Sequence, residues 1–592
     1  MKSRWRFFVV TACAVAIAAL VWSPAFEDPA ATGYGDWQMV IHNWETGVIS
    51  LSRHGEWPLW DPYHCGGVTI FGNPESQHFS PLFFLALILG TNLALKLFVV
   101  LHAIAGFSGM FVLARRRYGL EPAGAALAAV AWGASGFFAW HGSGGHGTFL
   151  PFFLAPWVLL AWRRAVDDPR WCAALAALMV FVVLEGGTYP FPYFVVLLAF
   201  DAAVLMTDRD KRTDTVRAAA VSGALALLGS AIRLVPVREA LALIPRQVES
   251  TDAVELPDVV AMLTNPDHPY RWGHQYVWAE YGTFVGWGVV VLAIAGAWVA
   301  LRRGRKHLTV ALLLFGALML GSRGSFHPWP VLHQLPVYDS LRVPSRFAVL
   351  FSLYLALLAG LAVTHGSRWL AGLRLRRSLD WTRAVLPWLL VVPLGARVVD
   401  GNWDVVDRWD GVPLDTSDPA ERFHLLAAQN YNDTYASFPR QNVGTPRCYI
   451  GGMNWPVARG LWLGDVAQAH VEGTAGEVRR WGRTNNTVWA EVSLPQAGRV
   501  VFNQNHFPDW HASAGTVVND DGRLAADLPA GDRRVVLRYR PASLPWAAGL
   551  SVLGIVLCVL VARFGTRARL DAPWHLLARI LGLRRVAPTP DG

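Results

Sequence analysis

One carboxylate stands where chemistry at a membrane surface would need a base. Asp36 lies in the segment GYGDWQMVIHNW, which follows the first apolar stretch of the chain directly. A carboxylate held there can take a proton from a hydroxyl group. Asp36 also precedes a segment with helical periodicity, so its oxygens can equally accept hydrogen bonds from the first helical turn as an N-cap. The two roles are compatible, and the sequence leaves both open.

Five basic side chains are predicted to lie at or near the outer ends of apolar segments. Such groups could contact a phosphate, and the planar guanidinium fork of arginine matches phosphate oxygens best. The alternative is that these side chains extend to lipid headgroups, or that the histidine among them is a solvated loop residue. The candidates are Lys96, His146, Arg233, Arg342 and Arg346.

Aromatic and acidic side chains near the same membrane face could recognise a sugar. Aromatic rings can stack on sugar faces, but they also anchor proteins at membrane headgroups. The aromatic candidates are Trp37, Trp57, Trp60 and Tyr63. The carboxylates of Glu185 and Glu280 could bind sugar hydroxyls or a divalent metal, or they could pair with Arg233 or Arg346.

The composition indicates that membrane-spanning helices position these residues. Of the 592 residues, 53% are hydrophobic and only 16% are charged. Apolar runs of about 17 to 25 residues are long enough to cross a bilayer. About twelve spans are predicted, near residues 5–25, 92–114, 121–140, 147–162, 170–187, 189–206, 215–235, 280–301, 307–321, 346–364, 384–400 and 545–563.

Basic residues cluster after every second predicted span, and short cytoplasmic loops retain Lys and Arg. Both termini are therefore expected in the cytoplasm, with the first span kept as an uncleaved anchor rather than a cleaved signal peptide. The net charge of +9 mainly reflects this topology, so no nucleic-acid partner is expected. The segments expected outside are 26–80, 236–279, 322–345 and 401–544.

The first outer segment, residues 26–80, contains an apolar pattern with helical spacing. The pattern predicts an amphipathic helix from Asp36 to Arg53, lying on the membrane with its tryptophans at the headgroups. The residues that form the apolar stripe are Trp37, Val40, Ile41, Trp44, Val48 and Leu51. The rest of the segment, rich in Trp, Pro, Gly and His, is typical of a folded cover over a cavity.

The chain is predicted to divide into a membrane domain (1–400), an outer β-rich domain (401–544) and a last span with a basic cytoplasmic tail (545–592). Segments such as NTVWAEVSL, GRVVFNQNHF and RRVVLRYR alternate like half-buried strands, which favours a small β-sandwich. Cys65 and Cys448 both fall outside and could pair in an oxidising compartment. The sequence contains no P-loop and no metal-type Cys/His spacing.

The order of several motifs along the chain resembles the YfhO-like family of bacterial membrane proteins, which is related to the C-type glycosyltransferase superfamily. The resemblance runs from about residue 20 to residue 560. The motifs, in chain order, are GDW, GEWPLWDPYHCGG, SPLFF, HGTFLPFFLAPWVLLAWRR, EGGTYPFPY, EYGTFVG, LRVPSRF, NQNHFPDWHA and LPAGDRRVVLRYRP.

This resemblance implies a mainly α polytopic enzyme of the bacterial inner membrane, acting on its extracytoplasmic face. Its donor would be a sugar linked to polyprenyl phosphate, and its acceptor an envelope glycan, lipid or protein. By position, the acidic residue near the reaction centre maps to Asp36. The wider superfamily often shows two acids in or near this loop, and here the second could be Glu27, Asp28, Glu45 or Asp61.

Two other classes of function suit the same spans. A lipid or oligosaccharide transporter, or flippase, would spread polar residues through the full membrane depth, whereas the predicted intramembrane charges lie mainly near the outer face, with Asp201 the main exception. A non-catalytic scaffold for envelope assembly would depend on the outer β-rich domain and leave any cavity unused.

Overall fold

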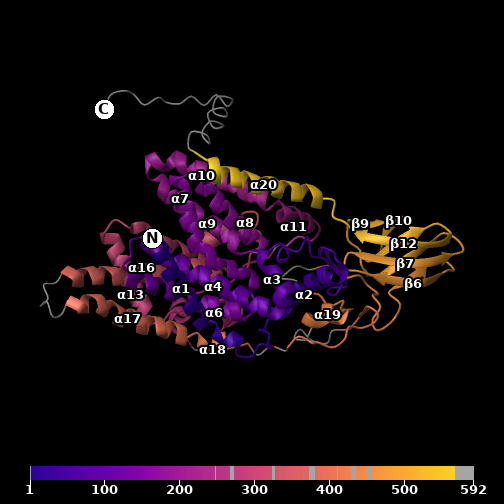
Figure 1. The fold of residues 1–592 in the computed structure, drawn as a ribbon, viewed down its shortest axis with the longest axis horizontal. Coiled ribbons are helices and arrows are strands. Elements are labelled where there is room, and N and C mark those ends of the chain that lie inside the picture. The colour runs from indigo at the N-terminus through magenta and orange to yellow at the C-terminus, as the bar shows by residue number, and fades with distance from the viewer. Residues whose placement is uncertain are drawn as a thin grey trace, which may run out of the picture.

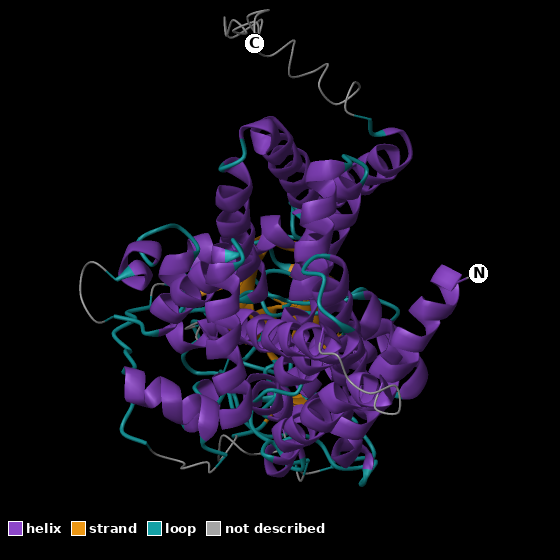
Figure 2. Ribbon diagram, turned by 90° about the vertical axis from the view of Figure 1, so that its left-hand side faces the viewer, coloured by secondary structure: helices purple, strands orange, loops and turns teal. Residues whose placement is uncertain are grey.

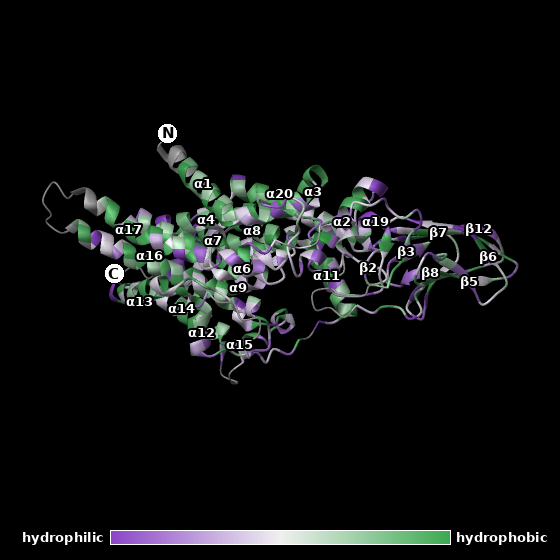
Figure 3. Cartoon of the chain, turned by 90° about the horizontal axis from the view of Figure 1, so that it is seen from below, coloured by the Kyte–Doolittle hydropathy of each residue, from purple (hydrophilic) through white to green (hydrophobic). Residues whose placement is uncertain are grey.

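The computed structural model describes residues 2–246, 248–266, 272–322, 327–372, 380–409, 411, 413–427, 435–449 and 455–566. It is mainly helical, with a sheet region near the C-terminus that extends from one end of the helical body (Figure 1). The helices gather in one body when seen from the side (Figure 2). Hydrophobic residues dominate these helices and are sparser in the sheets (Figure 3). The basic tail predicted in the cytoplasm extends beyond residue 566, outside the described residues.

Five helical segments of the described chain are long and apolar enough to cross a membrane. They agree closely with five predicted spans, although the full set of about twelve is not confirmed. The five segments are Thr91–Arg116 (α4), Pro122–Ser143 (α5, Pro122–Gly133, with α6, Gly136–Ser143), Gly147–Asp167 (η3, Gly147–Leu154, with α7, Ala155–Asp167), Pro344–Gly372 (η7, Pro344–Phe347, with α16, Ala348–Gly372) and Leu544–Phe564 (α20).

Shorter helices complete the body. Those that are apolar but only 10 to 17 residues long are Phe8–Val21 within α1 (Lys2–Val21), α8 (Trp171–Leu184), α9 (Pro190–Met206), α13 (Trp287–Arg302) and α14 (Lys306–Met319). The remaining helices include α2 (Trp37–His54), α3 (Phe84–Leu89), α12 (Leu256–Thr264), α15 (Pro328–Leu332), α17 (Asp380–Asp400), α18 (Trp403–Val406) and α19 (Phe438–Gln441).

Helix α16 lies deep in the body, packing against α5, α13 and α14. Small residues let the backbones approach closely. A Cβ on Gly124 of α5 would overlap the backbone oxygen of Gly360 in α16, and a Cβ on Gly296 of α13 would overlap that of Leu358. Membrane helices commonly associate through such small residues, because lipid gives apolar side chains no reason to prefer one another.

The predicted span 215–235 is broken in the structure. A single residue separates helix α10 (Arg212–Gly229) from helix α11 (Ala231–Leu243), and the axes of the two helices meet at 73°. Gly229 packs against Gly554 of α20, leaving no room for a Cβ on Gly554. The bend directs α11 and the residues that follow it toward the first outer segment.

The helix predicted in the first outer segment is present as α2, but its predicted position on the membrane is wrong. Trp37 and Trp44 are each only 1% exposed, so neither can lie among lipid headgroups. Trp37 donates a hydrogen bond from Nε1 to the backbone oxygen of Gly142, and Trp44 packs edge-on against Phe83. The apolar stripe of α2 therefore faces protein.

The C-terminal sheet region is a sandwich of two four-stranded antiparallel sheets. One sheet has the order β10-β11-β8-β5 and the other β6-β7-β12-β9. The strands are β5 (Ala469–Glu472), β6 (Glu477–Arg483), β7 (Thr487–Leu494), β8 (Gly498–Asn505), β9 (Trp510–Ala512), β10 (Thr516–Asp520), β11 (Arg523–Leu528) and β12 (Gly531–Tyr539). In β7 every second residue is buried, as the alternating sequence predicted.

The first outer segment and residues 424–427 and 435–449 join the sandwich to the helical body. A two-stranded pairing links β1 (Trp60–Asp61) with β2 (Val68–Thr69), and a second links β3 (His424–Leu425) with β4 (Val443–Gly444). A disulfide connects Cys65 to Cys448 across 383 residues of sequence. The segment 435–449, which includes Cys448 and Tyr449, is thereby fixed beside α2.

Candidate active site

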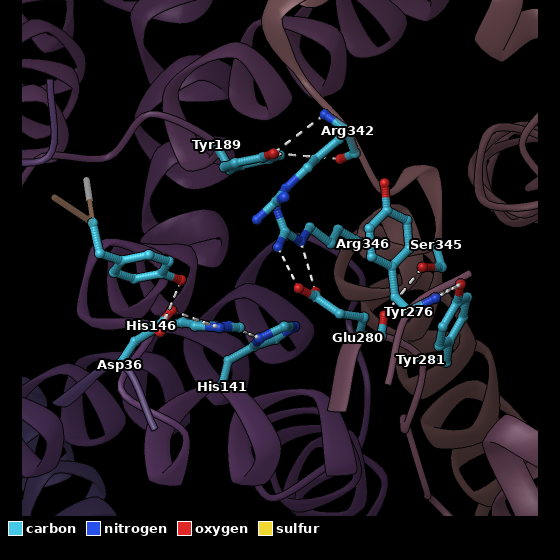
Figure 4. A network of polar contacts seen from close by, with 11 residues as sticks. Asp36, His141, His146, Tyr189, Tyr276, Glu280, Tyr281, Arg342, Ser345 and Arg346 are labelled. Carbon is cyan, nitrogen blue, oxygen red and sulfur yellow. Dashed lines mark hydrogen bonds and ion pairs between the residues drawn. The ribbon is translucent and has the colours of Figure 1, made fainter. Parts of the chain in front are cut away.

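A small cavity lies at the start of α2, where segments from six parts of the chain converge. Its volume is about 50 Å³, well below the roughly 300–1,000 Å³ of typical ligand pockets. Four of the predicted site residues, Asp36, His146, Arg342 and Arg346, line it together. The other lining residues are Met39, Val40, Glu75, Gly145, Gly147, Thr148, Phe149, Tyr189, Arg246 and Tyr449. Figure 4 shows part of this network.

Asp36 occupies the N-cap position of α2, but its side chain makes no capping hydrogen bond. Its backbone oxygen accepts from Met39 and Val40, as an N-cap carbonyl does, and its backbone nitrogen donates to Gly144. Gly145 allows this close approach, because a Cβ there would overlap the backbone nitrogen of Trp37 and its φ is +85°. The Asp36 carboxylate is thus left for contacts in the cavity.

Each oxygen of the Asp36 carboxylate meets a polar group. The Tyr449 hydroxyl donates to Oδ1 at 3.2 Å, and His146 Nε2 lies 3.4 Å from Oδ2. His146 Nδ1 lies 2.5 Å from Nδ1 of His141, so one proton must sit between these two nitrogens. If His141 supplies that proton, the remaining proton of His146 lies on Nε2, the nitrogen that faces Asp36. The opposite arrangement would turn a lone pair toward the carboxylate, which is unfavourable.

Arg346 is already paired. It donates from Nε and Nη2 to the two oxygens of Glu280, at 2.8 and 2.5 Å, and its guanidinium lies over the rings of Phe149 and Tyr189. Burial opposes ionisation of Glu280, but the Arg346 guanidinium outweighs it and holds the pKa of Glu280 well below its usual range. Of the roles open to Glu280 from the sequence, the structure shows the pairing with Arg346.

Arg342 and Arg246 line the cavity without such a partner. Their Nε atoms are buried, and neither makes a hydrogen bond within the described chain. The Tyr189 hydroxyl instead holds the backbone of Arg342, accepting from its nitrogen at 3.2 Å. Glu75 is also enclosed here: burial raises its pKa, although the charge of Arg246 opposes that rise. Sequence reasoning missed Arg246, because the bend before α11 decides where the residues after that helix lie.

Two groups of side chains have metal-ligand types, and neither fits a metal as placed. His141, His146 and Glu280 lie close together, but Arg346 takes both Glu280 oxygens. The two Nδ1 atoms, 2.5 Å apart, are also closer than the roughly 3.3 Å between nitrogens on one tetrahedral Zn²⁺ with bonds of about 2.0 Å.

The second group, His42, Asp61 and His64, is fully buried. His42 donates from Nδ1 to Tyr435 O and from Nε2 to Asp61, while His64 Nε2 accepts from the Tyr449 nitrogen. Burial opposes the charge on His42, yet Asp61 raises the pKa of His42 above its ordinary value. These hydrogen bonds join α2 to the segment that ends at Tyr449.

The remaining predicted phosphate ligands lie outside the cavity lining. Arg233 is buried and donates to the backbone oxygens of Phe71 and Asn73 at 3.0 and 2.6 Å. Lys96 donates to the backbone oxygen of Asp28 at 2.7 Å. Both cations therefore fix the first outer segment in this structure, and their role as phosphate ligands stays a prediction.

The predicted sugar-binding aromatic residues also lie outside the cavity lining, and their role stays a prediction. Trp60 is fully buried in the core of the sandwich, edge-on to Trp510, and Trp57 packs on Phe79. Tyr63 is 2% exposed and donates to Asn485. None of them, nor buried Trp37, presents a face to the cavity. Glu185 is likewise buried and accepts a hydrogen bond from the Ser80 hydroxyl.

No family model and no curated protein sequence matches this chain. The resemblance to the YfhO-like family therefore remains an expectation. Among solved structures, arabinofuranosyltransferase AftD from Mycobacteria has 16% identity and a TM-score of 0.47, over 92% of this chain and 40% of its own. The Archaeoglobus fulgidus oligosaccharyltransferase, in the apo form, has 13% identity and a TM-score of 0.45, over 74% of this chain and 64% of its own.

ArnT from Cupriavidus metallidurans, bound to undecaprenyl phosphate, has 15% identity and a TM-score of 0.44, over 73% of this chain and 85% of its own. This chain thus spans less than two thirds of the length of AftD and of the oligosaccharyltransferase. All three similar structures are glycosyl- or oligosaccharyltransferases or were solved with a polyprenyl phosphate. At these values the similarity assigns no activity to this chain.

Proposed function

We propose that this protein is a membrane glycosyltransferase that moves a sugar from a polyprenyl-phosphate donor to an acceptor of the bacterial cell envelope. One observation carries the proposal: a carboxylate and two guanidinium groups line one small cavity together. Asp36 supplies the carboxylate, and Arg342 and Arg246 supply the guanidinium groups. The acceptor would be an envelope glycan, lipid or protein.

The reaction needs the two kinds of group that this cavity brings together. The acceptor hydroxyl gives its proton to Asp36 while its oxygen bonds to the anomeric carbon of the sugar. The bond between that carbon and the phosphate oxygen breaks, and the polyprenyl phosphate leaves with the electron pair. Arg342 and Arg246 stabilise the charge that develops on this phosphate.

The other polar groups orient these reactants. His146 holds one oxygen of Asp36, and His141 fixes the proton of His146 on the side of the carboxylate. The charge of Arg346 is neutralised by Glu280. Arg346 therefore shapes the phosphate side of the cavity, and its fixed guanidinium group offers further N–H donors there. No step of this reaction requires a metal.

We place the cavity on the extracytoplasmic face of the inner membrane, with both termini in the cytoplasm. The disulfide between Cys65 and Cys448 supports this placement, because such bonds persist in oxidising compartments and are rare in the cytosol. Tyr449, which lines the cavity, follows Cys448 directly. The cavity and the disulfide therefore lie on the same side.

The test is a transfer assay on the purified full chain in proteoliposomes, with a panel of undecaprenyl-phosphate sugars and envelope glycan fractions. The expected result is loss of donor together with formation of a glycosylated acceptor, and binding of undecaprenyl phosphate itself. Movement of intact lipid-linked sugar across the vesicle membrane without transfer would favour the transporter. If undecaprenyl phosphate does not bind, and no donor in the panel is consumed, the proposal is wrong.

A further inference from the structure

The Tyr449 hydroxyl contacts the same carboxylate, Asp36, that an acceptor hydroxyl would contact in the proposed reaction. Its hydroxyl donates to Oδ1 of Asp36 at 3.2 Å, while His146 lies against Oδ2. A base takes a proton from an acceptor hydroxyl only when that hydroxyl lies within hydrogen-bond reach of it. The Tyr449 hydroxyl thus already makes the kind of hydrogen bond to Oδ1 that an acceptor hydroxyl would need.

The backbone of Tyr449 is fixed from both sides by the first outer segment. Its nitrogen donates to His64 Nε2 at 3.2 Å, and the preceding residue forms the disulfide with Cys65. His64 lies beside His42 of α2, with ring centroids 5.2 Å apart. The tyrosine is thus presented to Asp36 by contacts with residues that belong to the same segment as Asp36 itself.

The size of the cavity agrees with an occupied acceptor position. Its volume of about 50 Å³ is too small for a sugar and a hydroxyl-bearing acceptor together. Tyr449 is one of its walls, as are Met39 and Val40 of α2. The guanidinium groups of Arg342 and Arg246 belong to the loops after Leu341 and after α11, which are distant in sequence from the Tyr449 segment.

We propose that the Tyr449 hydroxyl occupies the acceptor-hydroxyl position on Asp36, so that the acceptor enters on the Tyr449 side of the cavity and must displace this side chain. The inference rests on the proposed function and extends it, because it assigns an alcohol hydroxyl as the nucleophile and separates an acceptor side from a phosphate side. Tyr449 is then a competitor that the acceptor replaces, which makes it a determinant of acceptor specificity.

The experiment compares Tyr449→Phe with the parent protein, using the donor that supports transfer and glycerol as the alcohol probe. Removing the competing hydroxyl should lower the KM for glycerol by about 2- to 10-fold, the value of one hydrogen bond of about 0.5–1.5 kcal/mol. Transfer to water, measured as release of free sugar, should rise by about the same factor. Binding of undecaprenyl phosphate should not change, because the phosphate side is untouched.

The matched control is Tyr63→Phe, which also removes a buried tyrosine hydroxyl but one bonded to Asn485, away from the cavity. It should leave the KM for glycerol unchanged. A fall in kcat for Tyr449→Phe with unchanged KM would overturn the inference, because it would make Tyr449 a positioning residue for Asp36. An unchanged KM and kcat would overturn it as well.

Two further measurements keep this result separate from the proposed function. If Asp36→Asn abolishes transfer while Tyr449→Phe behaves as the parent, only the acceptor inference fails. If Asp36→Asn retains the parent rate, the proposed function itself fails. Tyr449→Leu, which also removes the ring, should lower the KM for glycerol further, and an unchanged KM in this variant contradicts the inference as well.

Discussion

The carboxylate of Asp36 and the imidazole of His146 lie 3.4 Å apart, at the start of α2 and in the loop between α6 and η3. The backbone brings these two side chains together. Gly145, next to His146, has no Cβ, so it can lie directly against the backbone of Asp36. His141 contacts the other ring nitrogen of His146, Nδ1. The pair therefore behaves as one unit in which the base is held in a single orientation.

The first prediction concerns this unit. His146→Leu removes the donor to Asp36 and should lower kcat by about 10-fold or more, because a misoriented general base loses most of its 10²- to 10⁴-fold contribution. His146→Gln keeps a donor and should retain more activity than His146→Leu. The control is His102→Leu, which removes a buried histidine that contacts the backbone of Phe98 elsewhere in the body. Equal kcat values for His146→Leu and the parent would contradict the role.

The second prediction concerns two arginines of the cavity, Arg342 and Arg246. Arg342→Ala and Arg246→Ala should each weaken binding of undecaprenyl phosphate by about 10- to 100-fold, since hydrogen bonds to charged groups are worth about 1.5–3 kcal/mol. Arg238→Ala, which removes an exposed arginine of α11, should not change the affinity. The measurement is a binding titration in detergent at fixed ionic strength. Parent affinity in both cavity variants would remove these residues from the phosphate side.

The third prediction concerns Glu280 and Arg346. Glu280→Gln leaves a buried guanidinium without its counter-charge and should destabilise the protein by about 3–5 kcal/mol, seen as a lower temperature of unfolding. The double variant Glu280→Gln with Arg346→Gln should recover part of this loss. Full stability of the single variant would show that the pair contributes nothing.

The same pair predicts a dependence of stability on pH. Because the folded pKa of Glu280 lies below its ordinary value, the pair stabilises the fold fully above the unfolded pKa of about 4.3. This contribution is lost as the pH falls toward the folded pKa. The unfolding temperatures of the parent and Glu280→Gln should therefore differ by a constant amount from pH 7 down to about pH 4.3 and converge as the pH falls further; a difference that stays constant below that pH would be inconsistent with this sign.

Hydropathy predicted the membrane helices well where one helix crosses without interruption, as for α4, α16 and α20. It missed the break after Gly229, because both halves are apolar and the bend follows from packing against α20. It also placed α2 on the membrane. An apolar stripe has the same spacing whether lipid or protein covers it, so the amphipathic pattern alone could not distinguish the two.

For the site, the sequence identified single residues by type but not which of them meet. Asp36, His146, Arg342 and Arg346 were identified and converge, whereas Arg233 and Lys96 have the same chemistry and bond to backbone oxygens instead. Tyr449 and Arg246 carried no distinguishing pattern. Their roles arise from a disulfide and a helix bend, which act between segments that are far apart in the chain.

The most direct test of the account is the rate of sugar transfer by Asp36→Asn. Asparagine keeps the size of the side chain and can still accept the hydrogen bond from Tyr449, but it cannot take the acceptor proton. We predict that transfer falls by about 10²- to 10⁴-fold while undecaprenyl phosphate binds as in the parent. Asp418→Asn, which changes an exposed acid outside the cavity lining, should transfer at the parent rate. Transfer at the parent rate by Asp36→Asn would contradict the central claim.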